Sequence, residues 1–112
     1  MCASEKRVMW ITGAAGGVGR ATVAVFARAG WCVIGVDRNP FGEGFPEDGL
    51  FIHADIAQPS QMESIFTQTQ AFTKRLDAVV NNAAMQIAKP LVDTTVEEWD
   101  LVMATNLRSV FL

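Results

Sequence analysis

The sequence predicts an α/β fold in which a parallel sheet is covered by helices on both faces. Three observations support this: the strand-like segments are short apolar runs with little alternation, helix-like segments separate them, and glycine or polar residues stand where the strands should end. Apolar runs of this kind are typical of parallel strands buried on both faces. The 112 residues, half of them hydrophobic, are enough for one core. We therefore expect a single domain over 1–112.

The first unit along the chain is a strand, a glycine-rich turn and a helix. An apolar segment at 7–11 precedes the turn, and residues 18–29 have helical spacing before Gly30, a common helix C-cap residue. The turn, 12–19, reads Thr-Gly-Ala-Ala-Gly-Gly-Val-Gly. Glycine lets the chain turn tightly, lets backbone N–H groups approach a diphosphate and lets the helix pack close to the strand. A glycine cluster alone is also compatible with a flexible loop, but the flanking strand and helix favour a dinucleotide-binding turn.

The remaining chain continues the alternation, with one loop in place of a helix. Further strands are expected at 31–36, 50–54 and 76–80, and further helices from 59 onward and over 96–112. The intervening segment 39–49 holds two prolines and three glycines, which exclude a regular helix. The whole pattern predicts a Rossmann-like doubly wound parallel sheet with strand order 3-2-1-4.

Two residue pairs predict where the later helices begin. Ser60 and Glu63, and again Thr95 and Glu98, have the spacing of a capping box. No helix-ending signal follows in the last residues of the chain, so we expect the helix over 96–112 to end without a cap.

Acidic and amide residues follow the predicted strand ends, where parallel sheets bind ligands. Asp37 lies about 20 residues beyond the glycine turn, where a carboxylate can accept hydrogen bonds from both ribose hydroxyls of an adenosine. It would repel a 2′-phosphate, whereas the neighbouring Arg38 could bind one. Because no basic residue stands between Gly13 and Gly19, we favour NAD over NADP.

Together, these motifs resemble the short-chain dehydrogenase/reductase family from Arg7 onward. The resemblance rests on the glycine spacing at 12–19, on Asp-Ile at 55–56 and on Asn-Asn-Ala-Ala at 81–84, where the family motif has glycine in place of Ala84. It implies a protein that transfers a hydride between NAD(P) and an alcohol or carbonyl. It also implies a set of cofactor-binding residues: Gly13, Gly17, Val18, Gly19, Asp37, Arg38, Asp55, Ile56, Asn82, Ala83 and Ala84.

The resemblance implies one catalytic residue, Asn106, whose main-chain carbonyl would hold a water in a proton relay beside a local bend in the helix. Without the resemblance, Asn106 is more simply a structural asparagine with a hydrogen-bond partner. The family's other catalytic residues are a serine and a Tyr-x-x-x-Lys pair on later elements. This chain contains no tyrosine. We therefore expect a truncated cofactor-binding half that is inactive alone, with an alcohol or carbonyl substrate only in a full-length relative.

Truncation would leave the strand at 76–80 as a sheet edge and the apolar side of the helix over 96–112 uncovered, which predicts self-association through that helix. Two other functions stay open. One is a non-enzymatic module that binds a dinucleotide or joins a longer partner. The other is a different Rossmann-like enzyme such as a methyltransferase, against which the glycine spacing and Asn-Asn-Ala at 81–83 argue.

Composition narrows the remaining classes of function and of cellular location. A net charge of −3 gives no electrostatic footprint for nucleic acid, and the apolar runs are too short to cross a membrane. Residues 1–7 lack the apolar core of a signal peptide, so we expect a cytoplasmic protein. Cys2 and Cys32 are expected to be free thiols, and no metal site is expected. The lone His53 is interpreted as structural.

Overall fold

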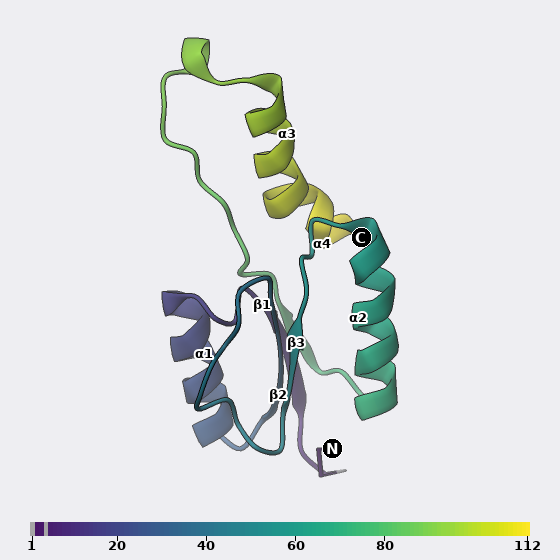
Figure 1. Ribbon diagram of the computed structural model, residues 1–112. Coiled ribbons are helices and arrows are strands. Elements are labelled where there is room, and N and C mark those ends of the chain that lie inside the picture. Colours follow the sequence, from purple (N-terminus) through teal and green to yellow (C-terminus); the bar gives the residue numbers. More distant parts are fainter. Residues whose placement is uncertain (1, 4) are drawn as a thin grey trace.

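The computed structural model describes residues 2–3 and 5–112, and its centre is a parallel sheet (Figure 1). The strands are β1 (Val8–Thr12), β2 (Cys32–Asp37), β3 (Leu50–His53) and β4 (Ala78–Val80). They pair in the order β3-β2-β1-β4, and all three pairings are parallel. The predicted α/β class and the strand order 3-2-1-4 are confirmed.

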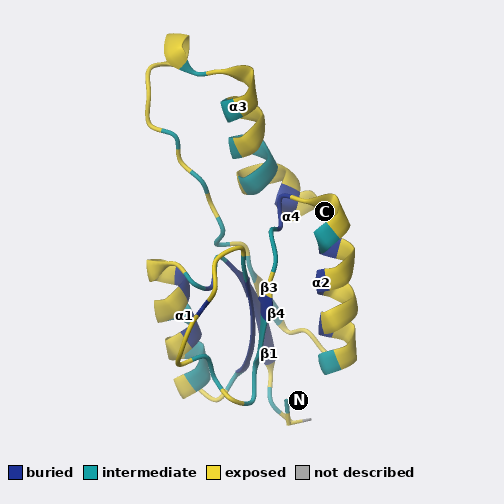
Figure 2. Ribbon diagram, in the orientation of Figure 1, coloured by how far each residue is buried: buried dark blue, intermediate teal, exposed yellow. Residues whose placement is uncertain are grey.

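Helices cover the two faces of the sheet. Helix α1 (Gly17–Arg28) lies on one face and helix α2 (Pro59–Phe72) on the other. Successive strand side chains point to opposite faces, so Met9 of β1 packs in the cluster beneath α1 while Trp10 packs in the cluster beneath α2. Figure 2 shows that the buried residues concentrate in the strands and on the inner sides of these helices. β1 and β2 are therefore buried on both faces, as their apolar runs predict, whereas Val79 of the edge strand β4 is 49% exposed.

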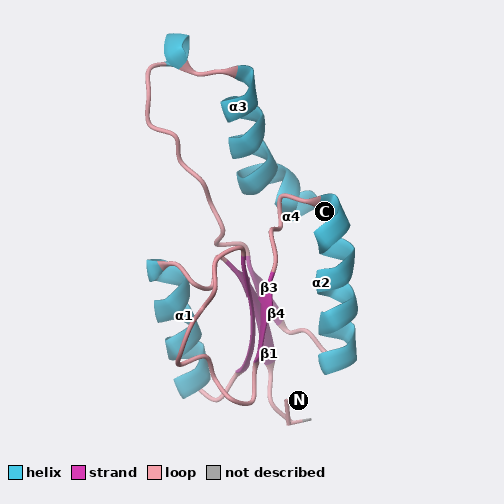
Figure 3. Cartoon of the chain, viewed as in Figure 1, coloured by secondary structure: helices cyan, strands magenta, loops and turns pink. Residues whose placement is uncertain are grey.

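Aromatic side chains replace a helix after β2. Residues 39–49 form a loop, as their prolines and glycines predict (Figure 3). Phe41 and Phe45 of this loop and Phe51 of β3 contact one another, with ring centroids 5.0–5.7 Å apart. Phe41 is only 6% exposed. The aromatic rings of this loop thus cover the α1 face of the sheet. A segment without regular secondary structure can therefore still exclude water there.

The last helical segment lies beyond the carboxyl ends of the strands (Figure 1). It consists of α3 (Val96–Met103), a π-helical turn (Ala104–Arg108) and α4 (Ser109–Phe111). The capping box at Thr95 and Glu98 is confirmed: the Glu98 N–H donates to the Thr95 hydroxyl at 3.1 Å, and the Thr95 N–H donates to the Glu98 carboxylate at 3.0 Å. The π-helical turn lies around Asn106, where a local bend was expected.

The capping box expected at Ser60 and Glu63 is wrong. Helix α2 begins at Pro59, after an N-cap residue, Gln58, whose side chain makes no capping hydrogen bond. Proline fits the first helical position because its fixed φ is already helical and its missing N–H would have no partner there. Pro59 therefore sets the start of the helix one residue before Ser60, which lies inside the first turn.

The expectation of two free thiols is also wrong. Cys2 and Cys32 form a disulfide with their Cα atoms 5.7 Å apart, a usual separation for such a bond. The bond ties the described segment 2–3 to the first residue of β2. No periodic pattern in the sequence predicts the path of that segment, so the spacing of Cys2 and Cys32 did not indicate that they pair.

Candidate functional site

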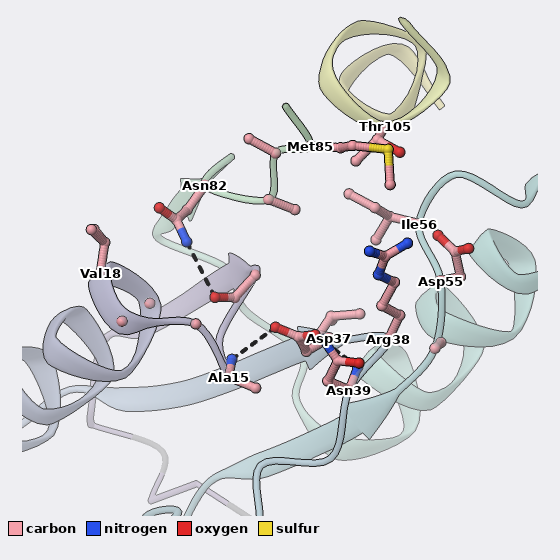
Figure 4. Close-up of a pocket in the computed structure, with 18 residues that line it drawn as sticks. Ala15, Val18, Asp37, Arg38, Asn39, Asp55, Ile56, Asn82, Met85 and Thr105 are labelled. Carbon is pink, nitrogen blue, oxygen red and sulfur yellow. Dashed lines mark hydrogen bonds between the residues drawn. The ribbon is translucent and has the colours of Figure 1, made fainter. Parts of the chain in front are cut away.

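A cavity of about 340 Å³ opens at the carboxyl ends of the strands (Figure 4). The glycine turn, the ends of β2 and β3, and the segment after β4 surround it. Its lining residues are Gly13, Ala15, Gly16, Gly17, Val18, Gly19, Val36, Asp37, Arg38, Asn39, Ala54, Asp55, Ile56, Asn82, Ala83, Ala84, Met85 and Thr105. Every residue that the sequence analysis assigned to cofactor binding lines this cavity. Asn106 does not.

The glycine turn packs so closely that it excludes side chains at two positions. Gly13 has a φ of +67°, and a Cβ there would lie 2.9 Å from both the Asn82 amide nitrogen and the Ala83 Cα. A Cβ on Gly19 would overlap the carbonyl oxygen of Gly13 and lie 2.8 Å from its carbonyl carbon. At Gly17, by contrast, no protein atom lies within 4 Å of a built Cβ, and this residue borders the cavity. Gly13 and Gly19 therefore serve packing, while Gly17 leaves space open for a ligand.

Thr12 and Asn82 join the carboxyl ends of β1 and β4, which are neighbours in the sheet. The Thr12 hydroxyl accepts hydrogen bonds from the Asn82 N–H at 3.1 Å and the Ala83 N–H at 3.0 Å. The Asn82 side-chain amide in turn donates to the carbonyls of Thr12 and Gly13, both at 3.2 Å. These bonds link residues about 70 positions apart, and they fix the turn against the segment that follows β4.

Asp37 fixes the opposite side of the turn. Its carboxylate accepts hydrogen bonds from the Ala15 N–H at 2.9 Å and from the Asn39 N–H at 2.8 Å. Each oxygen accepts one of these bonds, so each keeps a further lone pair for a ligand. His53 supports the neighbouring segment, because its Nε2 lies 2.7 Å from the Arg38 carbonyl oxygen. His53 thus has the structural role expected of it. The Arg38 side chain extends toward Ile56 (Figure 4).

Asp55 and Ile56 form the wall of the cavity after β3. One Asp55 oxygen accepts the Ala57 N–H at 2.9 Å, and the Asp55 N–H donates to the Gln61 side chain at 2.7 Å. Ile56 is 8% exposed. A carboxylate and an apolar side chain thus stand side by side, and such a pair can accept from an amino group and pack along a flat ring.

Asn106 lies apart from this cavity and makes a reciprocal pair of hydrogen bonds with Met85. The Met85 N–H donates to the Asn106 side-chain oxygen Oδ1 at 2.7 Å, and the Asn106 Nδ2 donates to the Met85 main-chain carbonyl at 2.9 Å. The side chain therefore has the partner that a structural asparagine needs. This pair also ties the segment after β4 to the π-helical turn.

Sequence reasoning assigned no cofactor contact to seven further lining residues: Ala15, Gly16, Val36, Asn39, Ala54, Met85 and Thr105. Ala15 and Asn39 are neighbours of assigned residues. Each donates its N–H to the Asp37 carboxylate, and these two bonds depend on how the turn and the loop approach each other. Thr105 stands one residue before Asn106. Its place near Met85 and Ile56 (Figure 4) follows from the position of the whole helix, which no local pattern gives.

Within the described ranges, 2–3 and 5–112, no three potential metal ligands from histidine, cysteine, aspartate or glutamate gather in one place. In the same ranges, no helix has the length and apolar composition needed to cross a bilayer.

Comparison with known proteins gives a consistent result. The family model described as short chain dehydrogenase matches residues 7–112. Cyclopentanol dehydrogenase of Comamonas sp. (strain NCIMB 9872) is 35% identical over 114 residues, covering 95% of this chain and 46% of its own length. The 3-oxoacyl-[acyl-carrier-protein] reductase FabG of Escherichia coli (strain K12) is 31% identical over 112 residues, covering 96% and 46%. The chain spans about half the length of these curated relatives.

Solved structures agree in fold. A 3-ketoacyl-(acyl-carrier-protein) reductase from Brucella melitensis, complexed with NADH, superposes with a TM-score of 0.88 at 27% identity, covering 98% of this chain and 48% of that protein. A short chain dehydrogenase from Leptospira borgpetersenii with bound NAD⁺ gives a TM-score of 0.87 at 26% identity, with 95% and 42% covered.

Proposed function

The chain belongs to the short-chain dehydrogenase family, and we propose that its cavity binds NAD or NADH. The observation that carries this proposal is the combination of an open glycine turn at the start of α1 with a carboxylate, Asp37, that is fixed beside this turn and lines the same cavity. Two of the structural relatives hold NADH and NAD⁺. A calorimetric titration of the purified chain with NADH tests the proposal.

The residues present fit such a ligand. The start of α1 provides backbone N–H groups without helical partners and the positive end of the helix dipole, which suit a diphosphate. Gly17 leaves room for the diphosphate, since a Cβ at this position would have no atom from another part of the protein within 4 Å. Asp37 would accept from the ribose hydroxyls. Asp55 would accept from the adenine amine while Ile56 lies along the ring.

We propose that NAD is preferred over NADP. A carboxylate at Asp37 repels a 2′-phosphate, and the Ala15 and Asn39 N–H groups hold this carboxylate at the cavity wall. Arg38 is the residue that would oppose this preference, because a guanidinium can bind a phosphate. Parallel titrations with NADH and NADPH distinguish the two: tighter NADPH binding would contradict the proposal.

We further propose that these 112 residues do not catalyse hydride transfer alone. When bound, a nicotinamide dinucleotide supplies the hydride-transfer chemistry, but the proton also needs a donor. The family's donor is a tyrosine, and the sequence has none. Asn106 would then only hold a water through its main-chain carbonyl. Measurable oxidation of NADH with a panel of carbonyl compounds would overturn this proposal.

We propose self-association through residues 96–112. Large apolar side chains of this segment are exposed: Val96 by 71%, Trp99 by 55%, Leu107 by 60%, Val110 by 52% and Phe111 by 88%. Apolar exposure on this scale is unusual for a monomer. Light scattering after gel filtration should give a mass above that of one chain, and Phe111→Asp should lower it. Co-purification with a longer related chain would instead favour the alternative, an oligomerisation module.

The cytoplasm is the compartment we propose. Disulfides are rare there because the thiol pool is reducing, so the Cys2–Cys32 bond of the structure is the observation that opposes this proposal. Alkylating the cysteines at the moment of lysis, followed by mass spectrometry, tests this. Recovery of the disulfide in most molecules would contradict a cytoplasmic location.

A further inference from the structure

We propose that Arg20 is a positioning residue for the adenosine-ribose end of the cavity. It lies on α1, outside the set of residues that line the cavity. It acts through two segments that do line it, the glycine turn and the loop after β2. This inference deepens the proposed function and rests on it, because the positioned wall matters only for a dinucleotide bound there.

Three contacts hold Arg20 between the turn and the loop. Its Nε donates to the Ala15 carbonyl at 3.1 Å, and its Nη2 donates to the Phe41 carbonyl. Its guanidinium carbon also lies 4.0 Å from the centroid of the Phe41 ring. The planar guanidinium suits this arrangement because its donors diverge in fixed directions while its face packs on a ring.

The contacts of Arg20 continue directly into the cavity wall. Ala15 is held on both sides, since its N–H donates to Asp37 and its carbonyl accepts from Arg20. Asp37 in turn accepts from Asn39, two residues before Phe41. The turn and the loop are thus joined twice, by Asp37 at the cavity and by Arg20 behind it. Among the described residues, removing Arg20 leaves Asp37 as the side chain that hydrogen-bonds to both the turn and the loop, beside the apolar packing of Ala14 and Phe41.

The consequence concerns selectivity as well as affinity. With both links present, the wall beside Asp37 is held close to the position of a ribose, and a 2′-phosphate would need that wall to move. Without Arg20 the loop can relax outward, so NADH should lose affinity while NADPH should lose less. Loss of charge-assisted hydrogen bonds and of a pre-formed wall corresponds to roughly a tenfold rise in the NADH dissociation constant.

The test compares Arg20→Met with Arg28→Met, a matched control on the same helix. Both variants lose one positive charge, but the Arg28 side chain is exposed in the last turn of α1 and makes no hydrogen bond or ion pair with the described residues. Calorimetry with NADH and with NADPH should show a Kd for NADH about tenfold higher in Arg20→Met and a smaller NADH preference. Arg28→Met should match the wild type. A general loss of folded protein would lower the fitted stoichiometry for both ligands and leave their Kd ratio unchanged.

Arg20→Lys separates position from charge, since it keeps the positive charge but lacks the planar fork. It should resemble Arg20→Met more than the wild type. Wild-type affinity and selectivity in Arg20→Lys, or an unchanged Kd ratio in Arg20→Met, would overturn the proposal.

Amide hydrogen exchange of the free protein tests the link without any ligand. Exchange at Ala15 should be faster in Arg20→Met and unchanged in Arg28→Met. Unchanged exchange in Arg20→Met overturns the positioning role itself. If Ala15 exchanges faster in Arg20→Met but the folded wild type binds neither NADH nor NADPH, the positioning role stands and the proposed function is contradicted. The use of this link in binding is then contradicted as well.

Discussion

Replacing Gly19 with alanine should destabilise the protein, whereas the same change at Gly17 should not. A Cβ on Gly19 would overlap the Gly13 carbonyl oxygen and lie 2.8 Å from its carbonyl carbon and 2.9 Å from the Ala14 Cα. These neighbours are backbone atoms, so α1 and the turn would have to move apart. Overpacking of this kind costs about 1–3 kcal/mol, against a gain of at most about 1 kcal/mol in helix propensity.

Thermal unfolding measures the difference. A net loss of about 2 kcal/mol lowers the Tm of a chain of this size by roughly 6–12 °C. Gly17→Ala should keep or slightly raise the Tm, because its Cβ meets no protein atom within 4 Å. Its Cβ would project where we propose the diphosphate lies, so NADH binding should weaken at least about tenfold.

Comparing Gly19→Ala with Gly17→Ala tests two separate claims, one about packing and one about the place of the diphosphate. A Gly19→Ala protein as stable as the wild type would refute the packing argument for the glycine turn. A Gly17→Ala protein that binds NADH as tightly as the wild type would refute the placement of the diphosphate, whatever the stability of either variant.

Three further predictions follow from other contacts. Cys2→Ser should lower the stability of the oxidised protein by about 3–4 kcal/mol, the chain-entropy value for a disulfide of sequence separation 30; urea unfolding with and without reductant measures this. Hydrogen bonds from Arg75 and from the Val8 N–H lower the pKa of Asp77 from its ordinary value of 3.8. Since the folded-state pKa of Asp77 lies below the unfolded one, the ionised carboxylate stabilises the fold above the unfolded pKa, and this stabilisation is lost as the pH falls through the folded pKa. The free energy of unfolding of Asp77→Asn in urea should therefore differ from that of the wild type at pH 7 and approach it at pH 3. Asn82→Ala should cost about 1–3 kcal/mol, because the carbonyls of Thr12 and Gly13 lose its amide as a donor, although Gly13 keeps the Gly16 N–H; thermal unfolding measures this.

Each of these has a clear contrary result. Equal stability of Cys2→Ser and the wild type under oxidising conditions would contradict the disulfide. A stability gap for Asp77→Asn that does not shrink at all as the pH falls below 3.8 would show that its role does not depend on charge. An Asn82→Ala variant with wild-type Tm would show that water satisfies those carbonyls at no cost.

Much of the fold follows from local patterns. The apolar runs of β1 and β2 predict buried parallel strands, and the glycine turn predicts the junction of β1 and α1, because both features are set by burial and by backbone sterics. The loop at 39–49 is equally readable from its prolines and glycines. These features require no knowledge of distant residues.

The features that sequence reasoning missed depend on relations between segments. The start of α2 near residue 59 was predicted, but the capping box at Ser60 and Glu63 was wrong, because Pro59 takes the first helical position and Ser60 lies inside the first turn. The disulfide depends on the path of the segment before β1. The Asn106–Met85 pair joins residues 21 apart through the position of a whole helix. In the candidate site, the assigned lining residues followed from the strand ends together with the family resemblance, but Thr105 and the hydrogen bonds that fix Asp37 and Ala15 did not.

The most direct test of the account is calorimetric titration of the folded wild type and of Asp37→Ala with NADH. Asp37 joins the turn to the loop and faces the cavity, so its loss should remove both a ribose acceptor and a wall contact. We predict saturable one-site binding by the wild type and at least about a tenfold weaker Kd for the variant. Absence of binding by a folded wild type, or equal affinity of the two proteins, would contradict the claim that this cavity is a dinucleotide site.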